Sequence, residues 1–350
     1  MVNRKLKAGI AVALLVLVLA ILADFIAPYS IDDQDRDHFL APPTRPHFVA
    51  EDGAWHSPFV YGSTLSDPTQ MIYVEERSIR QPVRFFVEGE RYRLFGVFPS
   101  TLHLFGVDAP GRIFLLGSDG LGRDVFSRLL VGTRLSLFIA VAALIISIPM
   151  ALALGCLAGY FGGKTDFVCM RLIELFLALP ALYLVIALRS ALPLNIPAEH
   201  VALALVFVLS LFGWAGLARI VRGMVLSLRQ RDYIVAAVAM GASDWRIVRR
   251  HLLPQLIGFI LIQAAISAPG FMLAEVTLSY LGLGIQEPAA SWGSMLSAAH
   301  NVEQMLSFWW NLAPAAAILV VSLTCQLLAE GLRQWSDPRQ QELSSLRETF

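Results

Sequence analysis

Six long apolar stretches dominate the distribution of hydrophobic and polar residues along the chain. They cover residues 8–27, 135–160, 172–192, 201–220, 256–276 and 312–332. A helix needs roughly 20 mostly apolar residues to cross the hydrocarbon core of a bilayer, and each stretch reaches that length. The pattern therefore predicts an all-α membrane protein with six transmembrane helices.

The first stretch has two interpretations, a cleaved signal peptide or a retained membrane anchor. A signal peptide has an apolar core of roughly 7–15 residues, which is shorter than this stretch. The segment also ends in the run Asp24–Tyr29, which offers no clean cleavage site between small residues. These two features favour a retained anchor.

Lysine and arginine are distributed unevenly among the connecting segments. They occur before the first stretch, at 161–171, at 219–250 and after the last stretch, whereas 193–200 and 277–311 contain neither. Positive charge in short loops stays on the cytoplasmic side. Both termini of this multi-pass protein are therefore predicted to be cytoplasmic, in the bacterial inner (plasma) membrane. Residues 28–134 are placed outside, because long loops largely escape this rule.

The segment after the first apolar stretch is the one part of the sequence with the pattern of a soluble domain. Pro42, Pro43 and Pro46 mark an irregular start. The stretches 82–87 and 92–98 are rich in β-branched and aromatic residues, with turn residues between them, which is typical of strands. We therefore expect a small β-rich extracytoplasmic insertion after the first helix.

These patterns divide the chain into four regions. The first two are residues 1–30, an N-terminal segment with the first transmembrane helix, and residues 31–115, the insertion. A core with five transmembrane helices and a cytoplasmic loop at 219–254 follows over residues 116–340, and residues 341–350 form a cytoplasmic tail.

Composition agrees with a membrane protein and argues against several other classes. Charged residues make up 15% of the chain and hydrophobic residues 56%, whereas a soluble domain carries about 25% charge. The formal net charge is +0, so no basic surface indicates a nucleic-acid partner. Cys156, Cys169 and Cys325 lack zinc-ligand or CxxC spacing, and we expect them to be small apolar packing residues without a metal.

No sequence motif predicts catalysis by this chain. The sequence contains neither HExxH nor GxSxG. Residues 158–165 resemble a loose Walker A motif, but Ala158 stands where that motif requires glycine, and the segment follows an apolar stretch instead of a strand. We expect a glycine-rich turn there, no enzymatic activity and no cofactor bound by this chain.

Three ionisable residues fall within apolar stretches, where a charge is costly. Glu174 and Arg189 lie near opposite ends of the third stretch, and Glu275 lies near the outer end of the fifth. Each could extend its charge to the membrane interface or contact another helix. Each could alternatively line a translocation path, for which Glu275 and the following Ser279 are the best candidates.

The cytoplasmic loop predicts two short helices joined by a tight turn. An alanine-rich segment, which includes Ala236 and Ala237, favours a helix. Gly241 can adopt a left-handed backbone and end that helix. Ser243 or Asp244 can then cap a second helix. Pro254 is expected to stop it before the fifth apolar stretch.

An apolar edge is predicted on the second of these short helices. Trp245, Val248 and Leu252 share one face at helical spacing, while Arg246, Arg249 and Arg250 supply polar positions. Such an edge fits a protein partner. It equally fits an amphipathic helix lying on anionic lipid, and the residues alone favour neither interpretation.

The loop resembles the coupling loop of ABC importer permeases. Ala236, Ala237, Gly241 and the pair Leu253-Pro254 match that motif, whereas Val235 stands where the family has glutamate. Any salt bridge that the family makes through this glutamate is therefore not expected here.

Three further stretches resemble the dipeptide/oligopeptide/nickel branch of these permeases. They are residues 116–128, residues 278–286 with 291–293, and residues 331–333 with 337–339. The insertion at 31–115 is longer than is usual in this branch, so the resemblance implies no role for it.

The resemblance implies the type I ABC importer permease fold and a set of partners. These are a second, different permease subunit, two cytoplasmic ATPases that bind ATP and magnesium, an extracytoplasmic solute-binding protein and the lipid membrane. The expected cargo is a dipeptide or oligopeptide, with nickel, an opine or a sugar as alternatives. Under this resemblance the loop is a lever, shaped by Gly241 and docked through Trp245 and Leu252. The rival classes are a channel or a sensor outside the ABC family, and an intramembrane enzyme.

Overall fold

A computed structural model describes residues 4–49, 53–94, 97–180, 183, 186–187, 196–298 and 307–336. The chain forms two compact units. The helical unit comprises Met1–Ala13, Phe138–Glu275 and Val321–Phe350, and the mixed unit comprises Leu14–Leu137 and Val276–Val320. Four parts of the sequence prediction lie wholly or partly outside the described residues: the end of the third apolar stretch, Arg189, residues 337–339 and the tail at 341–350.

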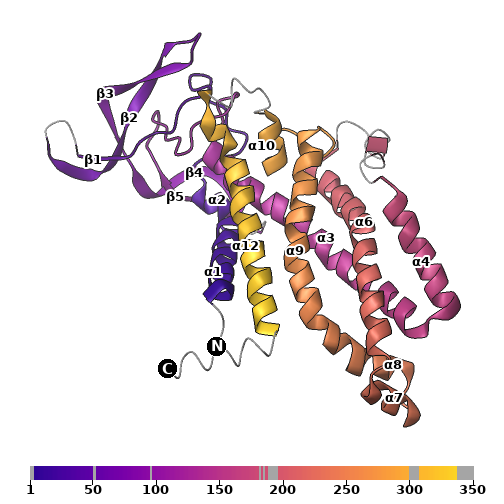
Figure 1. The fold of residues 1–350 in the computed structure, drawn as a ribbon. Coiled ribbons are helices and arrows are strands. Elements are labelled where there is room, and N and C mark those ends of the chain that lie inside the picture. Colours follow the sequence, from indigo (N-terminus) through magenta and orange to yellow (C-terminus); the bar gives the residue numbers. More distant parts are fainter. Residues whose placement is uncertain are drawn as a thin grey trace, which may run out of the picture. The chain divides into compact units, whose positions relative to one another are not determined.

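Helices account for most of the described chain (Figure 1). In chain order they are α1 Arg4–Ile21, α2 Ala23–Ile26, α3 Val125–Phe161, α4 Gly163–Ala178, α6 Ala198–Leu228, α7 Asp232–Ala239, α8 Asp244–Ile247, α9 Leu253–Tyr280, α10 Trp292–Ala298 and α12 Ala313–Ser336. A π-helical turn, Val248–Leu252, joins α8 to α9, and a 3₁₀ turn, Trp309–Leu312, precedes α12.

Four helical segments of the described chain are long and apolar enough to cross a membrane. They are Val125–Phe161, Ala198–Leu228, Asp244–Tyr280 and Trp309–Ser336. These segments contain the second, fourth, fifth and sixth apolar stretches of the sequence. The first stretch corresponds to α1 and α2, and the described part of the third lies mainly in α4.

Close packing of α3 against α6 depends on two glycines one helical turn apart. A Cβ atom on Gly155 would lie 2.7 Å from the backbone oxygen of Ala218, and one on Gly159 would lie 2.7 Å from that of Arg222. Small residues at this spacing let two helix backbones approach closely, which is common between membrane helices. This contact fixes the end of α6, from which the loop to α7 departs.

Helix α1 packs against α12 in the helical unit. A Cβ atom on Gly9 would lie 3.0 Å from a methyl carbon of Leu328, and one on Gly331 would lie 2.6 Å from Cβ of Leu6. Lys5 also forms an ion pair with Glu330. The first apolar stretch is therefore a packed helix, and its retention as an anchor stays a prediction.

The insertion is β-rich, as the sequence predicts. Strands β1 His47–Val49, β2 Trp55–Asp67 and β3 Ile72–Pro82 form an antiparallel sheet in that order, and β4 Arg84–Leu94 pairs with β5 Phe98–Gly106. The buried side chains of Val60, Phe105 and Ile113 form a small core. The stretch 92–98 is not a separate strand, because it ends β4 and reaches only the first residue of β5.

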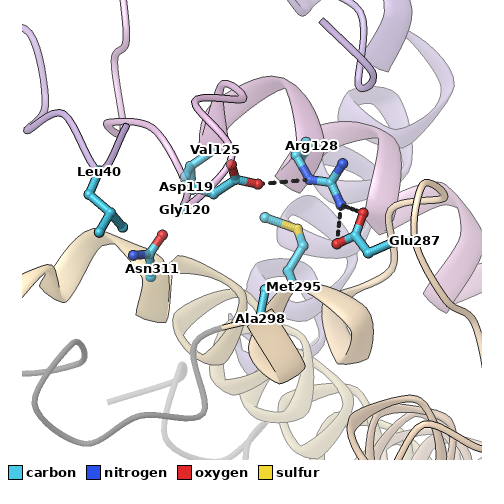
Figure 2. A pocket seen from close by; sticks show the side chains of 9 residues that line it. All are labelled: Leu40, Asp119, Gly120, Val125, Arg128, Glu287, Met295, Ala298 and Asn311. Carbon is cyan, nitrogen blue, oxygen red and sulfur yellow. Dashed lines mark hydrogen bonds and ion pairs between the residues drawn. The ribbon is translucent and has the colours of Figure 1, made fainter. Parts of the chain in front are cut away.

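The first stretch that resembles the importer branch contacts Glu287, which lies between the two parts of the second stretch, within the mixed unit (Figure 2). In the first, an isolated bridge joins Ser118 to Asp124 and closes a tight turn. The Asp119 carboxylate accepts hydrogen bonds from the backbone N–H groups of Leu121 (2.8 Å) and Arg123 (3.0 Å) within it. Trp292 of the second stretch donates a hydrogen bond from its backbone N–H to the hydroxyl of Ser136 (3.2 Å), which lies well inside α3.

Candidate functional site

The elbow, which we define as residues 232–254, begins with a helix that ends at a left-handed glycine. Gly241 has φ +81°. Its N–H donates to Val238 O (2.9 Å), and the N–H of Ala242 donates to Ala237 O (3.1 Å). This pair of bonds is a Schellman motif, which satisfies the last carbonyls of α7. The structure therefore confirms the backbone role predicted for Gly241.

The second arm of the elbow begins at Ser243 and is tied to another helix through Asp244. Ser243 occupies the N-cap position of α8, but its hydroxyl makes no capping hydrogen bond. The Asp244 carboxylate accepts a hydrogen bond from the Tyr160 hydroxyl (2.7 Å). Because Tyr160 lies in the last turn of α3, this bond fastens the elbow to that helix.

Pro254 does not stop the second arm, contrary to the sequence prediction. The helix continues from α8 through the π-helical turn into α9, and Pro254 is the second residue of α9. Proline has no N–H to donate, and its ring collides with a carbonyl one turn earlier. A wider turn immediately before it relieves that collision, which gives a physical reason for the π-helical turn.

The same π-helical turn corrects the predicted apolar edge. Leu252 is fully buried, whereas Trp245 is 67% exposed. In a regular α-helix the two residues would share one face, but the wider turn rotates Leu252 away by roughly a quarter of a turn. The prediction of Leu252 as a docking contact is therefore wrong for this structure.

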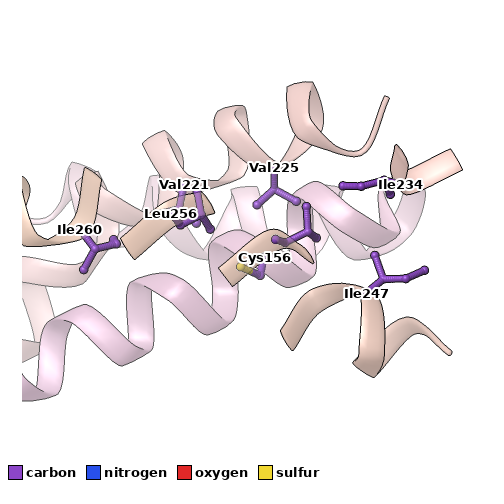
Figure 3. Close-up of a cluster of buried hydrophobic side chains, with 8 residues drawn as sticks. Cys156, Val221, Val225, Ile234, Ile247, Leu256 and Ile260 are labelled. Carbon is purple, nitrogen blue, oxygen red and sulfur yellow. The ribbon is translucent and has the colours of Figure 1, made fainter. Parts of the chain in front are cut away.

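Leu252 instead belongs to a buried cluster that attaches the elbow to α3 and α6. Figure 3 shows Ile234 and Ile247 of the elbow in this cluster, together with Val225 of α6. Its members come from the two arms of the elbow, the start of α9 and both neighbouring helices. They are Cys156, Val221, Val225, Ile234, Ile247, Leu252, Leu256 and Ile260. Burying an aliphatic side chain of this size contributes about 1.5–3 kcal/mol, so the elbow is a packed element with a fixed position on these helices.

The elbow's apolar face consists of Val235, Val238, Met240 and Trp245, all of which are exposed. Met240 is 82% exposed. Sequence reasoning identified Trp245 but missed the other three, although the spacing of Val235 and Val238 on α7 was a signal. Both residues match the coupling motif, but they lie on different sides of α7: Ala237 is buried on the packed side, and Ala236 is exposed.

Two arginines near the C-terminal end of α6 bind the ends of neighbouring helices. Arg229 donates from one guanidinium nitrogen to Gly159 O (3.2 Å) and Tyr160 O (3.1 Å), at the C-terminal end of α3. Arg222 forms an ion pair with Asp166 of α4, with a 2.9 Å hydrogen bond from Nε. Hydrogen bonds from Arg222 hold the pKa of Asp166 below its usual range, so the pair stays charged at neutral pH.

The segment that resembles a Walker A motif lies in a turn between two helices. Helix α3 ends at Phe161, and α4 begins at Gly163. A phosphate-binding loop of that type follows a strand, so the required setting is not present here. Within the described residues, no group of three or more His, Cys, Asp and Glu side chains could hold a metal.

The candidate path residues are buried. Glu275 in α9 is fully buried. Ser279 accepts a hydrogen bond on its hydroxyl from the backbone N–H of Ile285 (2.9 Å) and lines a cavity of about 290 Å³. Glu174 pairs with Arg171 (2.9 Å) on α4, which supports a contact within that helix. The assignment of Glu275 and Ser279 to a path remains a prediction.

Comparisons with known proteins place these features within a family. A family model described as "Binding-protein-dependent transport system inner membrane component" matches residues 151–342. A second, "N-terminal TM domain of oligopeptide transport permease C", matches residues 3–43. The first match contains the whole elbow.

Curated relatives are similar over about two thirds of the chain. "Oligopeptide transport system permease protein OppC" of Bacillus subtilis (strain 168) is 35% identical over 242 residues, which are 69% of this chain and 77% of that protein. "Dipeptide transport system permease protein DppC" of the same strain is 41% identical over 225 residues, 64% of this chain and 68% of that protein. Among solved structures, a chain of the inward-facing MetNI methionine ABC transporter matches with a TM-score of 0.45 and 16% identity, over 58% of this chain and 95% of that chain.

Proposed function

The chain belongs to the family of binding-protein-dependent transport system inner membrane components, which are permease subunits of ABC transporters. We propose that it forms half of the translocation path of an ATP-driven importer for dipeptides or oligopeptides. The observation that carries the peptide assignment is the similarity to relatives named as oligopeptide and dipeptide permeases. The family membership itself makes the chain a multi-pass inner-membrane protein and a transporter subunit, not an enzyme.

We propose a complete machine around this subunit. A second, different permease subunit supplies the other half of the path, and an extracytoplasmic solute-binding protein delivers the peptide. Two cytoplasmic ATPases bind ATP and magnesium, and one of them seats the elbow. The support within this chain is an elbow that is packed firmly on its inner side and apolar on its outer side.

The mechanism that we propose uses the elbow as a lever. Closure of the ATPase dimer around ATP displaces the elbow's apolar face. The Tyr160–Asp244 hydrogen bond and the buried cluster with Leu252 transmit that displacement to α3, α6 and α9. Packed helices move as rigid units with few alternative arrangements, so a small displacement at the elbow alternates access between the two sides of the membrane.

The proposed topology has six membrane crossings, cytoplasmic termini and an extracytoplasmic insertion at 31–115. Two serine-to-cysteine variants test it in a chain whose own three cysteines are replaced by alanine. Ser66→Cys lies in β2 and Ser243→Cys in the elbow, and both serines are exposed. A membrane-impermeant maleimide is expected to label Ser66→Cys in intact cells and Ser243→Cys only after the cells are opened. The reverse pattern would contradict the topology.

ATP hydrolysis is expected to require the partner subunits. The purified chain alone should show no ATP turnover, because the turn at Gly162 lacks the setting of a phosphate-binding loop. The assembled complex should hydrolyse ATP, and Lys164→Ala should leave that rate unchanged. Turnover by the isolated chain that disappears in Lys164→Ala would overturn this division of roles.

Uptake of labelled peptides by the reconstituted complex tests the proposed cargo. ATP-dependent accumulation of a labelled dipeptide or oligopeptide, presented with the cognate solute-binding protein, is the expected result. Accumulation of nickel, an opine or a sugar in place of every peptide tested would leave the permease role intact and contradict the peptide assignment.

A further inference from the structure

Two nearly buried arginines converge on one carboxylate in the mixed unit. The Arg128 side chain is 1% exposed and the Arg123 side chain 3% exposed. Arg128 donates from Nη2 to both carboxylate oxygens of Glu287 (3.0 Å each), and Arg123 donates from Nη2 to one of them (3.0 Å) and from Nη1 to the other. Figure 2 shows Arg128 facing Glu287 on one side and Asp119 on the other. Arg123 therefore binds the carboxylate as a fork with two nitrogens, and Arg128 adds a shared bond from one nitrogen, so all these bonds join charged groups and are strong.

Each arginine also has a partner other than Glu287. Arg123 donates from Nε to Asp119 (2.8 Å), four residues earlier in the same turn. Arg128 donates to Ile31 O (3.0 Å) and lies in the first turn of α3. We call this pair of guanidinium groups the arginine cradle.

Glu287 itself is held differently from the cradle. It lies in the loop between α9 and α10, and its side chain is 40% exposed. The loop is fastened to the cradle by one further contact, the donation from Arg128 to Pro288 O at 3.4 Å, which is long for a hydrogen bond. The Glu287 carboxylate is therefore the solvent-accessible partner, and the arginines of the cradle are the buried ones.

Glu287 lines two cavities. One cavity of about 30 Å³ is lined by Asp119, Arg128 and Glu287 among others. A second cavity of about 290 Å³ is lined by Ser279, Gln286, Glu287, Ser294 and Ser297 among others. The second is large enough for the end of a small polar ligand, and its lining is rich in hydroxyl and amide groups that can bind one.

Charge balance determines what can replace Glu287. The two arginines face two carboxylates, Asp119 and Glu287, and the nearby Asp124 carboxylate accepts its hydrogen bonds from Ser127 instead. If Glu287 leaves, the cradle keeps two positive charges against the single charge of Asp119. An uncompensated buried charge is strongly unfavourable, so departure of the Glu287 side chain favours the arrival of another anion.

We propose that Arg123 and Arg128 form a carboxylate-binding site, which Glu287 fills in this structure and which the C-terminal carboxylate of a transported peptide fills when the Glu287 side chain turns away. The identity of the incoming carboxylate rests on the proposed function, whereas the existence of the site does not. Exchange of one carboxylate for another keeps the buried charge balanced throughout.

Binding of propionate to the purified complex tests the site without any transport. Glu287→Ala removes the occupant and leaves room, and Glu287→Gln fills the same space without charge. Sodium propionate, compared with sodium chloride at equal ionic strength, should raise the unfolding midpoint of Glu287→Ala by about 5 °C at roughly 100-fold above its dissociation constant. Glu287→Gln should respond less, and the wild type least of all.

The controls make the outcome decisive. Adding Arg128→Gln to Glu287→Ala should abolish the propionate response. An equal response in wild type and Glu287→Ala, or none in Glu287→Ala, would overturn the site. If Glu287→Ala does not assemble, the comparison of Glu287→Gln with wild type decides in the same way.

The peptide assignment has its own test. A peptide with a free C-terminus should bind Glu287→Ala with a dissociation constant at least tenfold lower than that of the same peptide with an amidated C-terminus. A propionate response without this preference would keep the carboxylate site and reject the peptide as its ligand. Peptide uptake by the wild-type complex reports separately on the proposed function.

Discussion

Replacing Gly241 with valine is expected to abolish uptake while the chain still reaches the membrane at normal abundance. Gly241 has φ +81°, and a left-handed backbone costs a residue with a Cβ about 1–2 kcal/mol. That cost lowers the ratio of correctly bent to misbent elbows about 5- to 30-fold, and a β-branched residue suffers most. Insertion depends on the long apolar helices, none of which contains Gly241.

The space around Gly241 makes this prediction specific. No atom lies within 4 Å of the position that its Cβ would occupy, so a substitution changes the backbone preference without a collision. Gly223 in α6 is a matched control, because its Cβ position is equally open and its backbone is helical. Gly223→Ala should therefore transport normally, whereas Gly241→Ala should already lose uptake. Normal uptake by Gly241→Val at wild-type abundance would refute the lever.

Leu252→Ala and Trp245→Ala are expected to fail in different ways. Leu252 is fully buried in the cluster that holds the elbow, so its truncation should destabilise the folded protein by about 2–5 kcal/mol. Trp245 is mostly exposed, so its truncation should leave the unfolding midpoint unchanged and reduce ATPase association and uptake instead. Thermal unfolding and pull-down of the ATPase, measured on both variants, separate the two effects.

Two outcomes would contradict these roles of Leu252 and Trp245. If Leu252→Ala unfolds at the wild-type temperature but no longer binds the ATPase, then Leu252 is a docking contact after all. If Trp245→Ala unfolds at a markedly lower temperature, then its side chain stabilises the fold and its exposure does not reflect a partner surface.

Local features of the elbow were predictable from sequence because they depend on neighbouring residues. The alanine-rich arm, the glycine turn and the exposure of Trp245 all follow from short-range propensity and spacing. The burial of Leu252 was not predictable in this way, since it depends on a π-helical turn that changes the helical period. Pro254 was the available signal for that turn, but a proline near the start of a helix equally often marks a boundary.

Contacts between residues far apart in the sequence were not predictable from local patterns. Arg123 and Arg128 contact Glu287 from positions 164 and 159 residues away, and nothing in the local pattern joins them. The stretch 116–128, which contains both arginines, was singled out by resemblance to the importer branch, whereas Glu287 lies between the two parts of another such stretch and was not. The β-rich character of the insertion was predictable from alternation, whereas the single long strand β4 depends on its pairing with β5.

Photo-crosslinking from residue 245 tests most directly whether the elbow seats on an ATPase or rests on lipid. A photoreactive amino acid replaces Trp245 in the assembled complex in membranes, and in a control it replaces Trp55, an exposed residue of β2. The expected result is a crosslink from position 245 to an ATPase subunit, and none to an ATPase from position 55. Crosslinks from position 245 to lipid alone, in a complex that hydrolyses ATP, would contradict the coupling role of the elbow.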